Sequence, residues 1–260
     1  MKTLQFHYHM DIVFSEPVYN HTYTLKCLPQ TTQTQEITEC AVEVFPKGKM
    51  QESADSFGNR MLYGEAQEKQ SCFSVDVTGM AKTGLYKQAA ESDSERALYK
   101  YQTSLTSPGM QIQSLLGRLR KNSACSQKER IYSYMNAVYE SMQYTKGVTS
   151  ISTTAEEALS LGQGVCQDYA HILLSLCREE KIPARYVVGL LLGEGESHAW
   201  IEAFDGERWR GFDPTNNRLA EEDHIKISHG RDYRDCSINR GVFTGRATQR
   251  QTVLVRVTEV

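Results

Sequence analysis

The chain has 260 residues, 40% of them hydrophobic, so it is long enough for two modest domains with a substantial buried core. The formal net charge is −3 and no dense cluster of Lys and Arg occurs, which excludes the electrostatic footprint of a typical nucleic-acid-binding protein. Residues 1–17 alternate polar and apolar residues instead of forming the apolar core of a signal peptide, and no segment is apolar over a membrane-spanning length. We therefore expect a cytoplasmic protein that binds neither nucleic acid nor a membrane.

The cysteines argue against a disulfide framework and against a structural zinc site. There are seven, at positions 27, 40, 72, 125, 166, 177 and 236, which is an odd number without any C-x-x-C pair. Most are expected to be reduced thiols, and no metal or other cofactor is implied. A single cysteine is usually a small buried hydrophobic residue, so a catalytic role for one of them must be argued from its neighbours.

The N-terminal part, from residue 4 to about residue 88, has the pattern of short β-strands. Runs of alternating polarity such as FHYHMDIVF, ECAVEVFP and CFSVDV are separated by the turn segments EP, PKGK and DSFGN. This pattern predicts an antiparallel β domain, most simply a β-sandwich.

Helical spacing replaces this pattern between about residues 89 and 145, in the segments 91–102 and 126–142. The second segment has a capping box, Ser126 with Glu129, and one apolar face formed by Ile131, Met135, Val138 and Met142. The domain boundary should fall near 85–110. We expect an N-terminal β domain at 1–90 and a second domain at 91–260 that ends in a strand.

The segment GQGVCQDYAHILLSLC, residues 162–177, predicts a helix that begins at Cys166. The predicted apolar face includes Cys166 and is formed mainly by Tyr169, Ala170, Leu173, Leu176 and Cys177; Asp168, His171 and Arg178 are predicted to lie on the opposite, polar face. There His171 would pair with Asp168. The following ARYVVGLLL reads as a strand, so this half is α+β.

Cys166 has the position expected of a nucleophile. In the first turn of a helix, the positive end of the helix dipole and the unpaired N–H groups both favour the thiolate. The glycines at 162 and 164 allow the backbone to bend tightly, and the Cys166 N–H could then bind a substrate oxyanion. Gln163 and Tyr144 are two further candidate oxyanion donors, which the sequence leaves open.

A nucleophile also needs a base and a group that orients the base, and SHAWIEAFDGERWRGFDPTNN offers both. Asp205-Gly206 is a strong two-residue hairpin signal. A turn centred there places His198 opposite Asp213, with Trp200 opposite Gly211 and Glu202 opposite Trp209 on the same face. Directly opposed Cβ atoms lie about 4.5 to 5.5 Å apart, within reach of an imidazole–carboxylate hydrogen bond.

A Cys166–His198–Asp213 triad is therefore the catalytic hypothesis, although each residue alone has a plainer interpretation. We expect the other histidines to have no catalytic role: His7, His9 and His21 alternate within the β domain, and His224 and His229 lie in a polar stretch as surface residues.

The same residues carry a family resemblance. GVCQDYAHILLSLCREEKIPARYVVG, SHAWIEAF and GFDPTNN resemble the core of the bacterial transglutaminase-like superfamily of cysteine enzymes. DHIKISHGRDYRDCSINRGVFTG with its final strand is similar to the C-terminal signature of these proteins, and VFPKG and DSFGN resemble motifs of their N-terminal β domain. The resemblance covers nearly the whole chain. DCSINRG stands where family members commonly have a proline after GRDY, which affects a supporting loop and makes the fit of a substrate less certain.

The resemblance implies an N-terminal antiparallel β-sandwich followed by a papain-like core, in which the cysteine-bearing helix packs on an antiparallel sheet. It also implies that Cys166 is the nucleophile, His198 the base and Asp213 the orienting residue. The expected reaction is acyl transfer from an amide bond of a peptide or protein substrate through a thioester. Hydrolysis is favoured because no acidic calcium-binding loop is present.

Three alternatives remain open. The thioester could be released by an amine, which would cross-link proteins. The chain could be a catalytically silent binding module, which thiol reactivity would distinguish. It could also be an acyltransferase of the arylamine N-acetyltransferase kind, against which we find no glycine-rich or basic cluster for a nucleotide. The substrate and the oligomeric state do not follow from the sequence.

Overall fold

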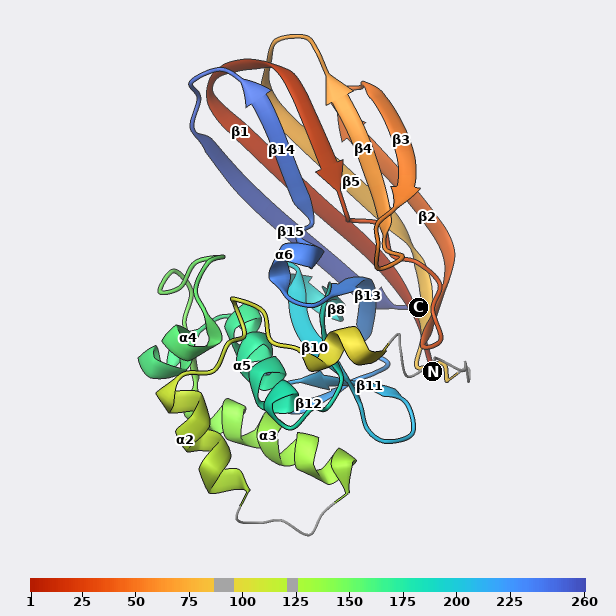
Figure 1. Cartoon of the computed structure of the whole chain (residues 1–260). Helices are drawn as coiled ribbons and strands as arrows, with labels where there is room; N and C mark the ends of the chain where they lie inside the picture. Colours follow the sequence, from red (N-terminus) through yellow and green to blue (C-terminus); the bar gives the residue numbers. More distant parts are fainter. Residues whose placement is uncertain (87–95, 121–125) are drawn as a thin grey trace.

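The computed structural model describes residues 1–86, 96–120 and 126–260 (Figure 1). Its architecture is mostly antiparallel: an eight-stranded sheet, a five-stranded sheet and a two-stranded pair organise the described residues. The eight strands are β1 (Lys2–Leu25), β2 (Gln35–Phe45), β3 (Lys49–Ala54), β4 (Arg60–Ala66), β5 (Gln70–Thr83), β9 (Gly193–Gly195), β14 (Asn239–Thr244) and β15 (Gln249–Glu259).

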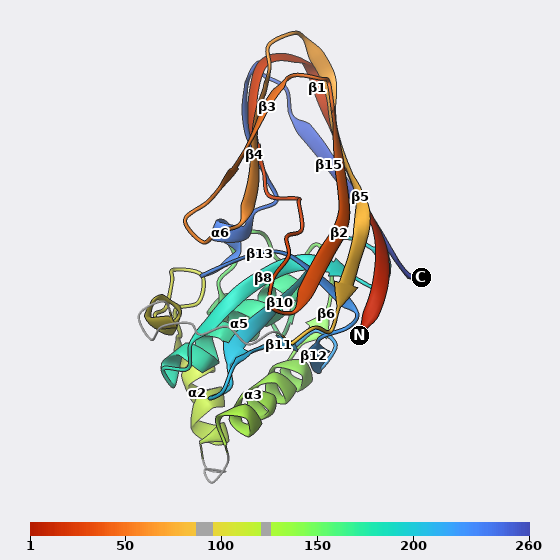
Figure 2. The same ribbon diagram turned by 90° about the vertical axis from the view of Figure 1, so that its right-hand side faces the viewer.

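The long strand β1 takes part in both layers of the predicted sandwich. Its first part pairs with β5 and β15, its last part pairs with β4 and β14, and the pairing is irregular between them. Figure 2 shows the two layers edge-on. Inward-facing side chains alternate along β1, as the sequence pattern predicts, and Phe6, Tyr8, Met10 and Ile12 are each at most 1% exposed. The two layers therefore pack face to face around one hydrophobic core.

The last strands of the chain lie in this N-terminal sheet. The strand β15 pairs with β1 from Leu4 opposite Glu259 to Phe14 opposite Gln249, and β14 pairs with the end of β1. In Figure 1 the blue C-terminal strands accordingly lie beside the red first strand. The division into domains at 1–90 and 91–260 stays a prediction.

The five-stranded sheet carries the second half of the chain in the order β12-β11-β10-β8-β13. The helix α5 packs on β10 and β8, and α2, α3 and α4 pack on α5. The bounds are α2 (Met110–Leu119), α3 (Gln127–Ser141), β6 (Gln143–Tyr144), α4 (Ala155–Leu161), β7 (Gln163–Gly164), α5 (Cys166–Glu179), β8 (Ala184–Leu191), β10 (His198–Phe204), β11 (Trp209–Asp213), β12 (Arg218–Ala220), β13 (His224–Gly230) and α6 (Tyr233–Cys236).

Two helix predictions have different outcomes. The helix α3 is confirmed with its capping box of Ser126 and Glu129 and with Ile131, Met135 and Val138 buried. Within the predicted helix 91–102, residues 91–95 lie outside the described residues, and the remainder contains a 3-10 helix at Leu98–Lys100. All six described cysteines are free thiols, as predicted, while Cys125 lies outside the described residues.

Two buried amide side chains join the halves of the molecule through β13. Gln35 accepts the N–H of Lys226 and donates to its carbonyl oxygen, both at 2.7 Å. Asn59 makes the same pair of bonds with His229, at 2.7 and 2.9 Å. Because both amides satisfy buried backbone groups, they fix the position of β13 against the N-terminal sheet.

Candidate active site

The helix α5 begins at Cys166, as predicted, and the turn before it depends on glycine. Gly162 ends α4 with a φ of +67°, a left-handed conformation that favours glycine. A Cβ atom on Gly164 would lie 2.5 Å from a carboxylate oxygen of Asp168. That carboxylate accepts the N–H of Val165 at 2.8 Å and the hydroxyl of Thr149 at 2.7 Å. Asp168 therefore holds the loop that presents the partly buried Cys166.

The predicted polar face of α5 is wrong. Asp168, His171 and Arg178 are each at most 1% exposed, because β8, α6 and neighbouring loops contact this face of α5. Arg178 donates to the carbonyl oxygens of Ala184 and Arg231 and to Thr106.

His171 does not pair with Asp168 among the contacts of the described residues, and Nε2 of its ring instead accepts the N–H of Tyr233 at 3.2 Å. Distant segments thus supply partners for Arg178 and for one nitrogen of His171, while His171 Nδ1 and Asp168 Oδ1 are buried without a hydrogen-bond partner in the part of the chain that the structure describes.

His198 and Asp213 meet as predicted, with His198 Nε2 2.8 Å from Asp213 Oδ2. The predicted register, however, is wrong by two residues. Glu202 lies opposite Gly211, and Phe204 lies opposite Trp209, so each residue of β10 faces a residue two positions further along β11. A shift of two residues preserves the alternation of faces. The histidine and the carboxylate therefore meet diagonally across the two strands, not directly opposite one another.

The side chain of Asp205 explains this shift. Its Oδ1 accepts the N–H groups of Glu207 and Arg208 at 3.0 and 2.9 Å, and its own N–H donates to the carbonyl oxygen of Arg208 at 2.9 Å. Asp205 is therefore the first residue of the turn and not a central one, and Gly206, with a φ of +108°, occupies the position that favours glycine.

Asp213 is fully buried and accepts hydrogen bonds on both oxygens. Oδ2 accepts from His198, from the Asn216 amide at 2.7 Å and from His224 Nε2 at 3.2 Å. Oδ1 accepts the backbone N–H groups of Thr215 and Asn216 at 3.1 and 3.3 Å. Burial by itself would raise the pKa of Asp213, but the hydrogen bonds from His198 and His224 lower it well below its usual value. Asp213 is thus an anion fixed in place.

The prediction that His224 and His229 are surface residues is wrong: His224 is buried, and His229 is partly buried. His224 is 5% exposed and contacts Asp213, and the His229 N–H bonds to Asn59. Burial lowers the pKa of both rings, which keeps them neutral. The run HIKIS alternates and so indicates a strand, but it puts His224 and Lys226 on the polar face and does not predict their burial.

Cys166 and His198 line the same cavity, and the Cys166 side chain lies close enough to the His198 ring to raise its pKa. Since Asp213 occupies Nε2, Nδ1 is the ring nitrogen that faces the thiol. Burial favours the neutral ring, but the hydrogen bonds to Asp213 and Cys166 raise the pKa of His198 to about 10. The structure thus brings together all three residues of the catalytic hypothesis.

Trp200 fixes the orientation of both imidazoles. Its ring stacks on that of His198, with centroids 6.2 Å apart, and meets His224 edge-on at 5.1 Å. The indole has room because Gly189 lies opposite His198 on β8, where an added Cβ atom would lie 2.5 Å from the Trp200 ring. The predicted pairing of Trp200 with Gly211 is therefore replaced by packing against Gly189.

A cavity of about 530 Å³ opens in front of Cys166 and His198. Val188, Tyr186 and Tyr233 give it an apolar and aromatic wall, and the segment from Glu194 to Ser197 forms another side. Tyr144 also lines the cavity, and burial together with the negative charge of Cys166 raises the pKa of its hydroxyl. Gln163 pairs its backbone with Gln143, outside the cavity lining. The first turn of α5 leaves N–H groups without intrahelical acceptors here.

His198, Asp213 and His224 also form a group that could hold a metal ion, with ligand atoms within 4.8 Å of one another. Both imidazoles already bond to the same oxygen of Asp213, and the second nitrogen of His198 faces Cys166. All three residues are also buried, so we assign this group to the catalytic hypothesis.

Two protein-family models match this chain, one over the N-terminal strands and one over the region of the candidate active site. Residues 113–214 match the transglutaminase-like superfamily, and residues 4–82 match the bacterial transglutaminase-like N-terminal region. An uncharacterized protein of Mycobacterium leprae is 38% identical over 129 residues, 46% of each chain. One of Mycobacterium tuberculosis strain H37Rv is 33% identical over 122 residues, 41% of this chain and 39% of that protein. The match thus spans less than half the length of these curated relatives.

A candidate cysteine protease from Cytophaga hutchinsonii has the same fold, with a TM-score of 0.81 over 100% of this chain and 92% of that protein, at 22% identity. The predicted fold class, a transglutaminase-like core behind an N-terminal β-sandwich, is thereby confirmed. None of the helices among the described residues is both long and apolar enough to cross a bilayer. The cytoplasmic location stays a prediction.

Proposed function

Because the chain belongs to the transglutaminase-like superfamily, we propose that it is a cysteine enzyme that transfers acyl groups from amide bonds through a thioester on Cys166. One observation carries the proposal. Asp213 Oδ2 lies 2.8 Å from His198 Nε2, and the His198 ring lines a cavity of about 530 Å³ together with Cys166. This arrangement supports the assignment of Cys166 as nucleophile, His198 as base and Asp213 as orienting residue, the three roles that covalent catalysis requires.

In the first step the Cys166 thiolate attacks the carbonyl carbon of an amide. The carbonyl oxygen becomes an oxyanion, which the unpaired N–H groups and the positive end of α5 stabilise. The protonated His198 then donates its Nδ1 proton to the amine as the C–N bond breaks. The products of this step are a free amine, a thioester on Cys166 and a neutral His198.

In the second step the neutral His198 acts as a base. Its Nδ1 takes a proton from water while the water oxygen attacks the thioester carbonyl, and the thiolate leaves as the C–S bond breaks. The acyl group departs as a carboxylic acid, and the imidazolium–thiolate pair is restored. Asp213 keeps the proton on Nε2 throughout, so the free nitrogen always faces the sulfur.

Hydrolysis is the outcome that we propose, with a peptide or an isopeptide bond in a protein as the substrate. Release of the same thioester by an amine would instead cross-link two proteins. Both outcomes use the same first step, and they differ only in the molecule that reaches the thioester.

The test is to incubate the wild-type protein and the Cys166→Ala variant with a library of peptides and isopeptides in H₂¹⁸O, with and without a primary amine. Mass spectrometry should find ¹⁸O in new carboxyl groups with the wild type alone. Products that carry the added amine and no ¹⁸O would show that the enzyme transfers the acyl group to an amine and does not hydrolyse the thioester. Equal product patterns for both proteins would favour the silent binding module.

A further inference from the structure

A second cluster of histidine and carboxylate side chains lies on the N-terminal sheet, remote in sequence from the candidate active site. His7 and His9 occupy alternate positions of β1, and Asp76 of β5 lies directly opposite His9. Alternation places the three side chains on one face, and the residue between the histidines, Tyr8, points into the core at 1% exposure. The cluster therefore faces solvent and is held on two paired strands.

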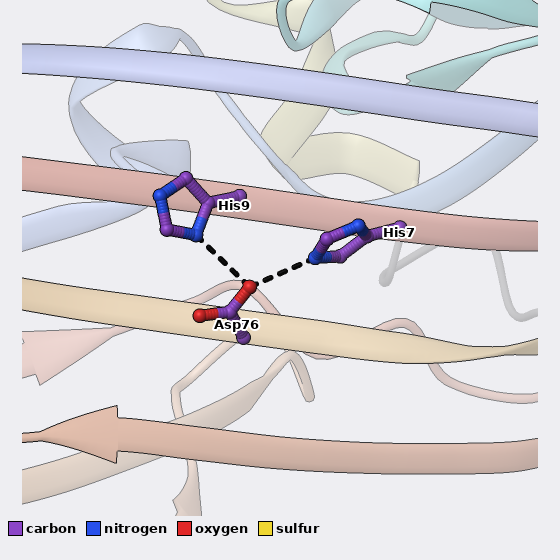
Figure 3. A group of neighbouring side chains, drawn as sticks. All are labelled: His7, His9 and Asp76. Carbon is purple, nitrogen blue, oxygen red and sulfur yellow. Dashed lines mark hydrogen bonds and ion pairs between the residues drawn. The ribbon is translucent and has the colours of Figure 1, made fainter.

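Both rings point to the same carboxylate oxygen (Figure 3). His7 Nε2 lies 2.8 Å and His9 Nδ1 2.9 Å from Asp76 Oδ1, and the three atoms lie within 4.8 Å of one another. Zinc bonds to imidazole nitrogen and carboxylate oxygen at about 2.0–2.2 Å, so tetrahedral ligand atoms lie about 3.4 Å apart. Small rotations of the side chains would open the triangle of atoms to that size.

A second carboxylate orients one of the rings. Asp11 Oδ2 lies 2.8 Å from His9 Nε2, the nitrogen that does not face Asp76. In this arrangement Nδ1–H donates to Asp76 Oδ1 and Nε2–H donates to Asp11. An ion between Nδ1 and Asp76 Oδ1 would replace the Nδ1 proton, while the bond to Asp11 keeps the other proton on Nε2. A carboxylate that holds the outer nitrogen of a metal-binding imidazole is a common support of zinc sites.

We propose that His7, His9 and Asp76 bind a divalent transition-metal ion of the zinc type. Two imidazoles and one carboxylate suit such an ion better than they suit calcium or magnesium, which prefer oxygen ligands. The three side chains are 50%, 25% and 38% exposed, so a water molecule completes the coordination at the open position. The ion joins β1 to β5 on the face opposite the core.

The proposal is tested by calorimetric titration of the full chain with zinc chloride. We expect Asp76→Asn and His7→Gln each to weaken zinc binding at least about tenfold, and Asp11→Asn to weaken it about tenfold through the orientation of His9. Zinc should also raise the thermal midpoint of the wild type and leave that of Asp76→Asn unchanged, because only the native wild type binds the ion.

Glu43→Gln is the matched control. Glu43 lies opposite Asp76 on β2 and is exposed, so this variant removes the same charge from the same sheet without removing a ligand. Its zinc affinity should stay within about twofold of the wild type. Equal affinities of the wild type, Asp76→Asn and His7→Gln would overturn the proposal, as would an equal loss in Glu43→Gln.

Discussion

His224 Nε2 lies 3.2 Å from Asp213 Oδ2, the same oxygen that bonds to His198. The neutral ring of His224 donates this bond, since burial lowers its pKa. A hydrogen bond to a charged group contributes about 1.5–3 kcal/mol. We expect His224→Ala to lower kcat about 10- to 100-fold with little change in KM, because the Asp213 carboxylate loses one of the bonds that orient it.

His224→Gln retains a donor and should recover most of this loss. The comparison separates orientation of Asp213 from a general packing role. If steady-state kinetics showed His224→Gln to be as impaired as His224→Ala, the hydrogen bond would not be what matters.

Asp213→Asn should keep the fold and lower turnover by about four orders of magnitude, as in other triads. The amide can present an oxygen or a hydrogen to His198 but no longer stabilises the imidazolium. Turnover is measured with a substrate selected from the peptide and isopeptide library, and the thermal midpoint serves as the folding control. Turnover close to that of the wild type would leave Asp213 with only a structural role.

The pH dependence of kcat/KM should have an alkaline limb set by His198. The pKa of this ring is raised to about 10, so the ring carries the proton needed by the leaving amine at neutral pH and loses it only as the pH rises through about 10. Asp213→Asn removes an interaction that raises this pKa, while burial, which lowers it, remains. The limb should therefore move to lower pH in the variant. If the alkaline limbs of the wild type and of Asp213→Asn coincided between pH 7 and pH 11, this result would contradict the assignment of the proton to His198.

The buried His171 should make the protein sensitive to acid. Burial lowers its pKa to about 3, so between pH 6.5 and 3 the unfolded chain binds a proton that the folded chain does not. Stability then falls as the pH falls, by at most about 1.4 kcal/mol per pH unit. Between pH 7 and pH 5 the free energy of unfolding, measured with urea, should fall by about 2 kcal/mol less in His171→Gln than in the wild type. An equal loss in both proteins would show that other groups dominate.

The sequence predicts those parts of the site that depend on local pattern. The first turn of α5 at Cys166, the capping box of α3 and the common face of His198 and Asp213 follow from spacing and turn residues. The register of the hairpin cannot be predicted in this way. The Asp205 carboxylate accepts two backbone N–H groups, and this moves the centre of the turn by one residue.

Burial and long-range pairing are also beyond local pattern. Arg178 reads as a surface residue until Ala184 and Arg231 supply their carbonyl oxygens from other segments. The pairing of β15 with β1 joins residues near the two ends of the chain. His224 reaches Asp213 from β13, which is separated from β11 by β8 and β10 in the sheet.

The most direct measurement is the rate at which iodoacetamide labels individual cysteines near pH 6, read by peptide mapping. The imidazolium of His198 beside Cys166 stabilises the thiolate, so Cys166 should be labelled first, ahead of the exposed Cys72, which serves as an internal control. The His198→Ala variant should be labelled much more slowly at Cys166 and at an unchanged rate at Cys72. Labelling of Cys166 that is no faster than that of Cys72, or that His198→Ala leaves unchanged, would contradict the proposed catalytic pair.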